Sequence, residues 1–324
     1  MITTVVGNYP KIPSLGGGPN IRQAIARHDE GRITDQELAQ LFDEATVDAI
    51  QEQAQAGIDL ITDGHIRWDD GQTYLAAKLG GFSINGLIRY FDSNTYYRQP
   101  MVEGDVVWKS PILVRDLKFA VEASPVPVKV ALPGPFTLAS LSSNQHYQEQ
   151  KTLVMDLAAA LNQEAMSLEA AGATFVQFDE PSLLKAKSQF PLFQEASRVL
   201  TQGLTAKTAL YTYFGDVSGM VPQLFSLPFQ VFGLDFVTGP NNFPLVAGLP
   251  SDKELALGIL DARNTKMESV DEIVEAVRRV KQHVGLDRMY INPSCGLDFL
   301  PRRNAYNKLV RLVEGAKRAQ EVLS

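Results

Sequence analysis

The sequence predicts an α/β protein built as a (β/α)8 TIM barrel with a long insertion after the second strand. Eight short runs rich in apolar and β-branched residues recur along the 324 residues, and helical patterns fill most of the intervals between them. Strands that alternate with helices imply a parallel sheet, and eight such units close most naturally into a barrel. The runs span residues 3–6, 58–62, 128–132, 175–179, 206–210, 230–236, 254–260 and 288–292.

The first unit pairs the strand over 3–6 with a helical region over 21–56. The strand ends at Gly7-Asn8-Tyr9-Pro10, where proline stops regular pairing. Within the helical region, Thr34 and Glu37 have the spacing of a capping box, so a helix is expected to restart there.

Two connections stand apart from the strand and helix pattern. Leu15-Gly16-Gly17-Gly18-Pro19 is rich in glycine, but no GK[ST] follows, so a flexible loop is expected in place of a phosphate cradle. Residues 66–124 are too long for an ordinary connection. We expect a helix and a hairpin that cover the barrel mouth as a lid; simple packing against the barrel is the alternative. The aromatic residues of this insertion include Trp68, Tyr74, Tyr90, Tyr96, Tyr97 and Trp108.

The later units complete the pattern with helices expected over 153–171, 270–283 and 304–322. No linker divides the chain, so we predict one domain over 1–324. The alternative is a doubly wound open sheet, which would need a glycine fingerprint after the first strand that the sequence lacks.

Composition narrows the class of protein. Hydrophobic residues make up 45% and charged residues 21%, as in ordinary globular proteins. The net charge of -7 without a Lys/Arg run argues against nucleic acid or an anionic membrane as partner. The start lacks the pattern of a signal peptide, and no stretch approaches the roughly 20 apolar residues of a membrane span, so a cytoplasmic protein is expected. The single cysteine, Cys295, excludes an internal disulfide and any multi-cysteine zinc site.

Polar residues at the strand ends are the candidates for function, because a barrel gathers the carboxyl ends of its strands at one mouth. Asp179 and Asp235 have the chemistry of bases or of anchors for a substrate ammonium; the alternative is that each caps a helix or pairs with Arg263. The full set is Asn8, His65, Asp179, Glu180, Tyr211, Tyr213, Asp235, Asp261, Arg263, Asn264, Asn292 and Cys295.

Two further residue types point to chemistry. His65 is a candidate proton shuttle or ligand-binding group. Cys295 precedes a glycine at a strand-to-helix turn, where amide donors lower a thiol pKa; a buried filler is the alternative. His65, Asp235 and Cys295 are also weak metal candidates, since no pair of them has short ligand spacing.

The ordered motifs resemble the cobalamin-independent methionine synthase family. These barrel enzymes move a methyl group from a carrier to the thiol of homocysteine. The matching segments span nearly the whole chain. They are Val5-Val6-Gly7-Asn8-Tyr9-Pro10, Ala56-Gly57-Ile58-Asp59-Leu60, Pro133-Gly134-Pro135-Phe136-Thr137, Gln177-Phe178-Asp179-Glu180-Pro181 and Asn292-Pro293-Ser294-Cys295-Gly296-Leu297.

The resemblance is mixed, because long family members fuse two barrels and only the C-terminal one binds zinc. The segments 90–97 and 211–214 resemble the zinc-free barrel. The zinc-binding His-x-Cys pair reads Tyr213-Phe214-Gly215 here, so two ligands are absent, while Asp235 and Cys295 match the other two. The family glutamate that holds the homocysteine amino group reads His65, and the corresponding aspartate is matched by Asp179.

The resemblance implies a methyltransferase with a folate or corrinoid carrier as methyl donor and an incomplete zinc site. Two alternatives stay open: a non-catalytic subunit that binds the carrier or docks on a zinc-bearing barrel or corrinoid protein, and an enzyme with another substrate. Arg22 matches a basic residue that faces the folate in the family. The predicted catalytic residues are His65, Asp179 and Cys295, and the predicted substrate-binding residues are Asn8, Arg22, Trp68, Glu180, Tyr213 and Asp235.

Overall fold

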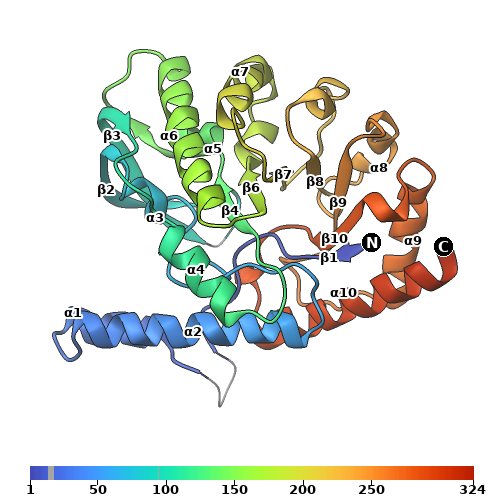
Figure 1. Ribbon diagram of the computed structural model, residues 1–324, viewed down its shortest axis with the longest axis horizontal. Coiled ribbons are helices and arrows are strands. Elements are labelled where there is room, and N and C mark those ends of the chain that lie inside the picture. Colours follow the sequence, from blue (N-terminus) through green and yellow to red (C-terminus); the bar gives the residue numbers. More distant parts are fainter. Residues whose placement is uncertain (14–17, 94) are drawn as a thin grey trace.

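The computed structural model describes residues 1–13, 18–93 and 95–324, so most of the glycine-rich loop around Gly16 lies outside the described residues (Figure 1). Seven parallel strands form a curved sheet in the order β1-β10-β9-β8-β7-β6-β4. They are β1 (Ile2–Thr3), β4 (Val130–Pro133), β6 (Phe175–Asp179), β7 (Lys207–Thr212), β8 (Val231–Asp235), β9 (Glu254–Leu260) and β10 (Met289–Pro293).

The predicted second strand closes this sheet into a barrel. Leu60 bridges Thr4, and Ile61 bridges Val128, both in parallel. The Leu60 amide donates to the Thr3 carbonyl at 3.1 Å, and the Lys129 amide donates to the Ile61 carbonyl at 2.9 Å. The (β/α)8 barrel prediction is therefore confirmed.

The first two strands are shorter than the sequence predicts, because side chains take the backbone groups near the mouth. The Gln53 amide accepts from the Thr62 N–H and donates to the Thr62 carbonyl. The Gln177 Nε2 donates to the Val6 carbonyl at 2.8 Å. These bonds replace strand pairing at both positions, so the ladder ends early.

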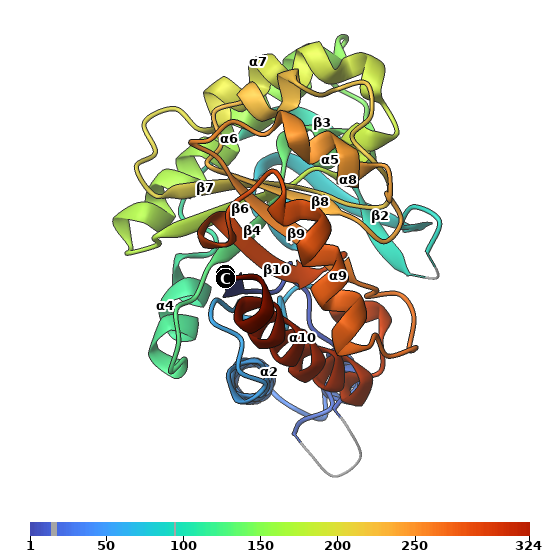
Figure 2. The same ribbon diagram turned by 90° about the vertical axis from the view of Figure 1, so that its right-hand side faces the viewer.

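Helices surround the sheet, with α2 and α10 side by side along one edge of the barrel (Figure 2). The predicted capping box between Thr34 and Glu37 is present and starts α2, and Ser269 with Glu272 starts α9 in the same way. The helices around the barrel are α1 (Ile21–Asp29), α2 (Asp35–Gln55), α5 (Pro135–Leu141), α6 (Gln150–Ala170), α7 (Phe190–Leu200), α8 (Asn242–Leu245), α9 (Val270–Lys281) and α10 (Arg302–Leu323).

The long insertion contains the expected helix and hairpin. It begins with the short α3 (Thr73–Ala76), continues into antiparallel β2 (Gly80–Arg89) and β3 (Tyr96–Val107), and ends with α4 (Val114–Ala123). The hairpin lies beside α6, and β3 also pairs with the two-residue β5 (Ser143–Asn144) (Figure 1).

Polar side chains occupy part of the barrel interior. Alternation along β6 sends Phe175, Gln177 and Asp179 to the same face, and the bond from Gln177 to Val6 across the barrel shows that this face points inward. Lys129 lies beside Gln177, and the two side chains are 1% and 0% exposed. A polar column therefore leads from the core toward the mouth. Among the described residues, no helix has the length and apolar character needed to cross a membrane.

Candidate active site

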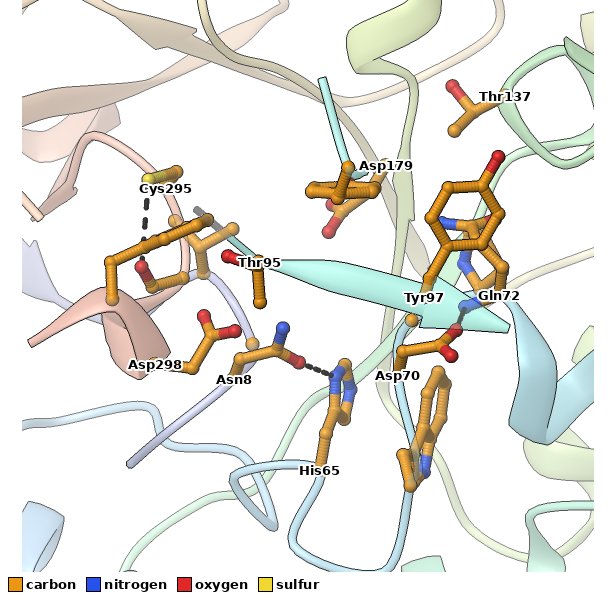
Figure 3. A pocket seen from close by; sticks show the side chains of 18 of the residues that line it. Asn8, His65, Asp70, Gln72, Thr95, Tyr97, Thr137, Asp179, Cys295 and Asp298 are labelled. Atoms are coloured by element: carbon orange, nitrogen blue, oxygen red, sulfur yellow. Dashed lines mark hydrogen bonds between the residues drawn. The ribbon is translucent and has the colours of Figure 1, made fainter. Parts of the chain in front are cut away.

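The carboxyl ends of the barrel strands and the hairpin line one pocket with about 900 Å³ of open space (Figure 3). Asp179, Cys295, Asp298 and His65 surround this space. Six of the nine predicted site residues line the pocket, namely Asn8, His65, Trp68, Asp179, Tyr213 and Cys295.

Asp179 has two hydrogen-bond donors and an open side toward the pocket. Gln177 Nε2 donates to its Oδ1 at 2.7 Å, and the Tyr213 hydroxyl donates to its Oδ2 at 3.4 Å. Burial raises the pKa of Asp179 to about 7, while Gln177, Lys129 and Tyr213 oppose that rise. The carboxylate is thus suited to a cationic ligand, which would favour its charged form.

His65 is held by a hydrogen bond and a ring stack. Its Nδ1 lies 2.6 Å from Asn8 Oδ1, an acceptor, so Nδ1 carries the proton. The imidazole stacks on Trp68 with centroids 4.0 Å apart, and a Cβ on Gly7 would lie 3.0 Å from His65 Cε1. Burial lowers the pKa of His65 to about 3, so the ring is neutral at ordinary pH.

Cys295 is a buried thiol in the pocket wall. It is 1% exposed, and Sγ donates to the Gly296 carbonyl at 3.5 Å. Burial raises the pKa of Cys295 well above its usual range, and the nearby Asp235 and Asp298 add to that rise. The thiol is therefore protonated at neutral pH, in contrast to the activation that its turn suggested.

Glu180 and Asp235 do not line the pocket, because backbone amides occupy their carboxylates. Glu180 accepts from the Phe136 and Thr137 amides at 2.9 and 2.7 Å, at the N-terminus of α5. Asp235 accepts from the amides of Phe214, Val237 and Thr238 and from the Thr238 hydroxyl. Glu180 therefore caps α5. The donors to Asp235 lie in the loops after β7 and β8, and α8 begins with Asn241 as its N-cap, so Asp235 is occupied by loop amides and not by the helix N-terminus that the sequence offered as its alternative.

The three weak metal candidates do not assemble into a zinc site. His65 Nδ1 is engaged with Asn8, both oxygens of Asp235 are engaged with donors, and Cys295 is a protonated thiol. Within the described residues, no three His, Cys, Asp or Glu side chains lie close enough together to hold a metal ion. The residues present therefore do not fit the zinc centre that the family resemblance implies.

Several pocket residues escaped the sequence analysis, among them Gln72 and Asp298. Within the described part of the chain, Gln72 Oε1 and Asp298 Oδ1 are buried without a hydrogen-bond partner, as is Nε1 of the predicted residue Trp68. Burial raises the pKa of Asp298. Its position three residues after Cys295, at the loop that follows β10, was the signal that could have identified it. Gln72 and its neighbour Asp70 lie in an irregular loop before α3, where spacing carries no information.

The hairpin supplies aromatic residues to the pocket. Tyr90 follows β2, and its ring lies 6.1 Å from Tyr97 and 6.3 Å from Phe214 at the end of β7. Phe91 contacts Phe214 at 5.4 Å, and Arg263 pairs with Asp92 at 3.5 Å. The tip of the hairpin therefore contacts the barrel mouth next to Tyr213.

Arg22 lies outside this pocket, in a larger outer groove. It is exposed on α1, and the groove also contains Arg303 from the start of α10. Lys11, Trp68 and Asp298 line both the groove and the pocket. The groove therefore leads from α1 into the barrel mouth.

The amino-acid sequence of this chain is similar to a known protein family and to named proteins. Residues 1–318 match the family described as "Cobalamin-independent synthase, Catalytic domain". A "Methionine synthase" of Saccharolobus solfataricus is 34% identical over 99% of this chain and 95% of its own length. A "Methionine synthase" of Sulfurisphaera tokodaii is 33% identical over 99% of this chain and 93% of its own length.

A solved structure has the same fold. It is a B12-independent methionine synthase from Shewanella sp. W3-18-1 in complex with selenomethionine. It superposes on this chain with a TM-score of 0.83 at 23% sequence identity. The superposition covers 99% of this chain and 98% of the Shewanella chain. At this identity the likeness establishes the fold alone.

Proposed function

This chain belongs to the cobalamin-independent methionine synthase family, and from that premise we propose that its pocket transfers a methyl group to the sulfur of a homocysteine-like amino acid. The observation that carries the proposal is the position of Asp179. It is a half-buried carboxylate at the barrel mouth, with one side open to a pocket in which some polar atoms have no partner among the described residues.

Asp179 is proposed to hold the ammonium group of the amino acid. A bound ammonium would favour the charged carboxylate against the effect of burial. The aromatic rings of Tyr213, Tyr90 and Trp68 would enclose the aliphatic chain, since all three line the same pocket.

The transfer forms a sulfur–carbon bond and breaks the bond between the methyl carbon and a nitrogen of the donor. The thiol loses a proton, and the donor nitrogen gains one. We assign Asp298 as acceptor of the thiol proton, because its Oδ1 is buried in this pocket without a partner and its pKa is raised. Because the described residues do not fit zinc, the proposed transfer uses side chains of this protein alone to accept the thiol proton.

The outer groove is proposed to hold the carrier, a methyl-folate. A folate has an anionic glutamate tail, and Arg22 and Arg303 are exposed cations in this groove. Arg27 lies on the same helix but does not line the groove, so Arg27→Ala is a matched control for Arg22→Ala. We expect Arg22→Ala to weaken methyl-folate triglutamate binding about fivefold, an effect of one exposed charge, and Arg27→Ala to leave it unchanged.

The test of the proposed function is methionine formation by the purified chain. The protein is treated with a chelator and incubated with L-homocysteine and methyl-tetrahydrofolate triglutamate, with and without added zinc. We expect mass spectrometry to detect methionine under both conditions, and we expect Asp298→Asn to reduce the rate of methionine formation. Turnover only after zinc addition would contradict the metal-free assignment, and no turnover under either condition would contradict catalysis by the isolated chain.

The outer groove favours one second candidate, a carrier-binding subunit that works with a zinc-bearing barrel. Its prediction is tight methyl-folate binding without turnover. Addition of a separate zinc-bearing methionine synthase barrel would then restore methionine formation, whereas turnover by the isolated chain would exclude this candidate.

A further inference from the structure

A lysine that contacts no carboxylate of the described residues lies in the barrel core directly below the proposed substrate anchor. Lys129 is 1% exposed, and its Nζ donates to Gln177 Oε1 at 2.6 Å. The ammonium also faces the ring of Tyr211 at 4.7 Å and that of Phe175 at 5.7 Å. A buried ammonium is costly unless a charge or a polar network compensates it, so this lysine calls for an explanation beyond packing.

The Gln177 amide connects Lys129 to Asp179. Its oxygen accepts from the lysine, while its nitrogen donates to Asp179 Oδ1 at 2.7 Å and to the Val6 carbonyl at 2.8 Å. This orientation is the one that satisfies every partner, because a flipped amide would point its NH2 group at the ammonium and its oxygen at the carboxylate. The lysine thereby fixes the amide so that a donor faces Asp179.

The electrostatics agree with this geometry. Burial lowers the pKa of Lys129 to about 7, and Asp179 opposes that change. Burial raises the pKa of Asp179 to about 7, and Lys129 opposes that change in turn. Each group therefore favours the charged form of the other. The pair also acts on other titratable groups that face it: the Asp179 carboxylate raises the pKa of Tyr211, Tyr213, Tyr90 and Glu180, and the Lys129 ammonium lowers the pKa of His65.

We infer that Lys129 is a positioning residue that acts through Gln177 to hold the Asp179 carboxylate charged and oriented toward the pocket. The inference rests on the proposed function for the identity of the ligand, but not for the effect of Lys129 on Asp179. Lys129 would then act on the site from the barrel core, without lining the pocket that binds the substrate.

The test measures the ionisation of Asp179 directly. Protein labelled with 13C at the aspartate carboxyl carbons is titrated by NMR, and the Asp179 signal is assigned by its loss in Asp179→Asn. Lys129→Met removes the charge while keeping a long side chain. We expect it to move the Asp179 titration up by about one pH unit or more, the effect of losing a nearby opposite charge.

A matched control removes another buried lysine. Lys308 on α10 is 0% exposed and pairs with Glu268, which precedes α9; neither residue lines the pocket. Lys308→Met should leave the Asp179 titration unchanged, although it disrupts a buried ion pair. Gln177→Leu removes the amide that links Lys129 to Asp179 but keeps both charged groups. It should also raise the measured pKa of Asp179. It keeps the test available if Lys129→Met does not fold.

Ligand binding supplies the second readout, with L-methionine as probe. Lys129→Met should bind it about tenfold more weakly at pH 7, where Asp179 would be largely protonated, and should approach the wild-type affinity at pH 8.5. A shifted titration in a protein that does not bind L-methionine would support the role of Lys129 and contradict the proposed function. An Asp179 titration that is unchanged in both Lys129→Met and Gln177→Leu would overturn the inference.

Discussion

The ends of β6 and β8 both carry an aspartate, yet their environments differ. Asp235 receives four hydrogen bonds, three from the loop that follows β8 and one from the Phe214 amide after β7, and it does not line the pocket. Asp179 receives two, from Gln177 and Tyr213, and faces open space. A strand-end position is therefore insufficient to make a carboxylate functional, because the local supply of donors decides whether it stays available for a ligand.

The two aspartates also differ in what lies below them. A buried cation, Lys129, reaches Asp179 through Gln177. Burial raises the pKa of both aspartates, but at Asp235 the opposing effects come from Thr238 and backbone amides. Asp235 is thus stabilised by the loops after β7 and β8, whereas Asp179 depends on a core network and on the ligand that binds in the pocket.

The largest expected effect separates the two aspartates by ligand affinity. Asp179→Asn should weaken L-methionine binding by about 100-fold or more, since it leaves a bound ammonium without its buried charged partner. Asp235→Asn should leave the affinity of the folded protein within about threefold, since it removes no pocket contact. Calorimetric titration at pH 8 measures both. Similar losses in the two variants would remove the distinction.

Stability should show the reverse order. Asp235→Asn would point an amide NH2 at N–H donors, and the unsatisfied groups should cost about 2 kcal/mol in the free energy of unfolding. Asp179→Asn loses fewer bonds and also removes a buried charge. Urea unfolding at pH 8 measures both values. A larger loss for Asp179→Asn would show that its network is chiefly structural.

The pH dependence of stability sharpens the same comparison. The unfolded Asp179 ionises near pH 4, whereas the folded group keeps its proton to about pH 7. The folded state therefore binds more protons across this window, and the contribution of Asp179 to stability falls as the pH rises. Asp179→Asn should gain roughly 2–3 kcal/mol relative to wild type between pH 5 and pH 8. A relative loss would mean that the folded pKa of Asp179 is depressed.

The smallest expected effect concerns Cys295 in the same pocket wall. Because its thiol is buried and protonated, it should react with a disulfide reagent far more slowly than free cysteine at pH 8, and react fully in urea. Cys295→Ala should change L-methionine affinity by less than about threefold, as expected for a wall residue that carries no charge. Rapid native labelling would instead identify it as an activated nucleophile.

Sequence patterns were sufficient for the fold and for part of the site. Alternation and motif order located the eight barrel strands and put Asp179 at the end of one of them, because these follow from local periodicity. They could not separate Asp179 from Asp235, since that difference depends on which loop amides turn back toward the carboxylate. Lys129 was missed because its proposed role depends on a hydrogen bond to Gln177, which lies 48 residues away in the chain. Asp298 and Gln72 belong to loops whose conformation is set by tertiary packing.

A crystal structure of the protein with L-methionine bound would show whether Asp179 anchors the substrate. We expect the ligand to occupy the barrel-mouth pocket with its ammonium nitrogen about 2.7–3.0 Å from a carboxylate oxygen of Asp179. The Gln177 amide should still join Asp179 to Lys129. An amino group held elsewhere, with Asp179 facing only water, would contradict the assignment of Asp179 as the substrate anchor.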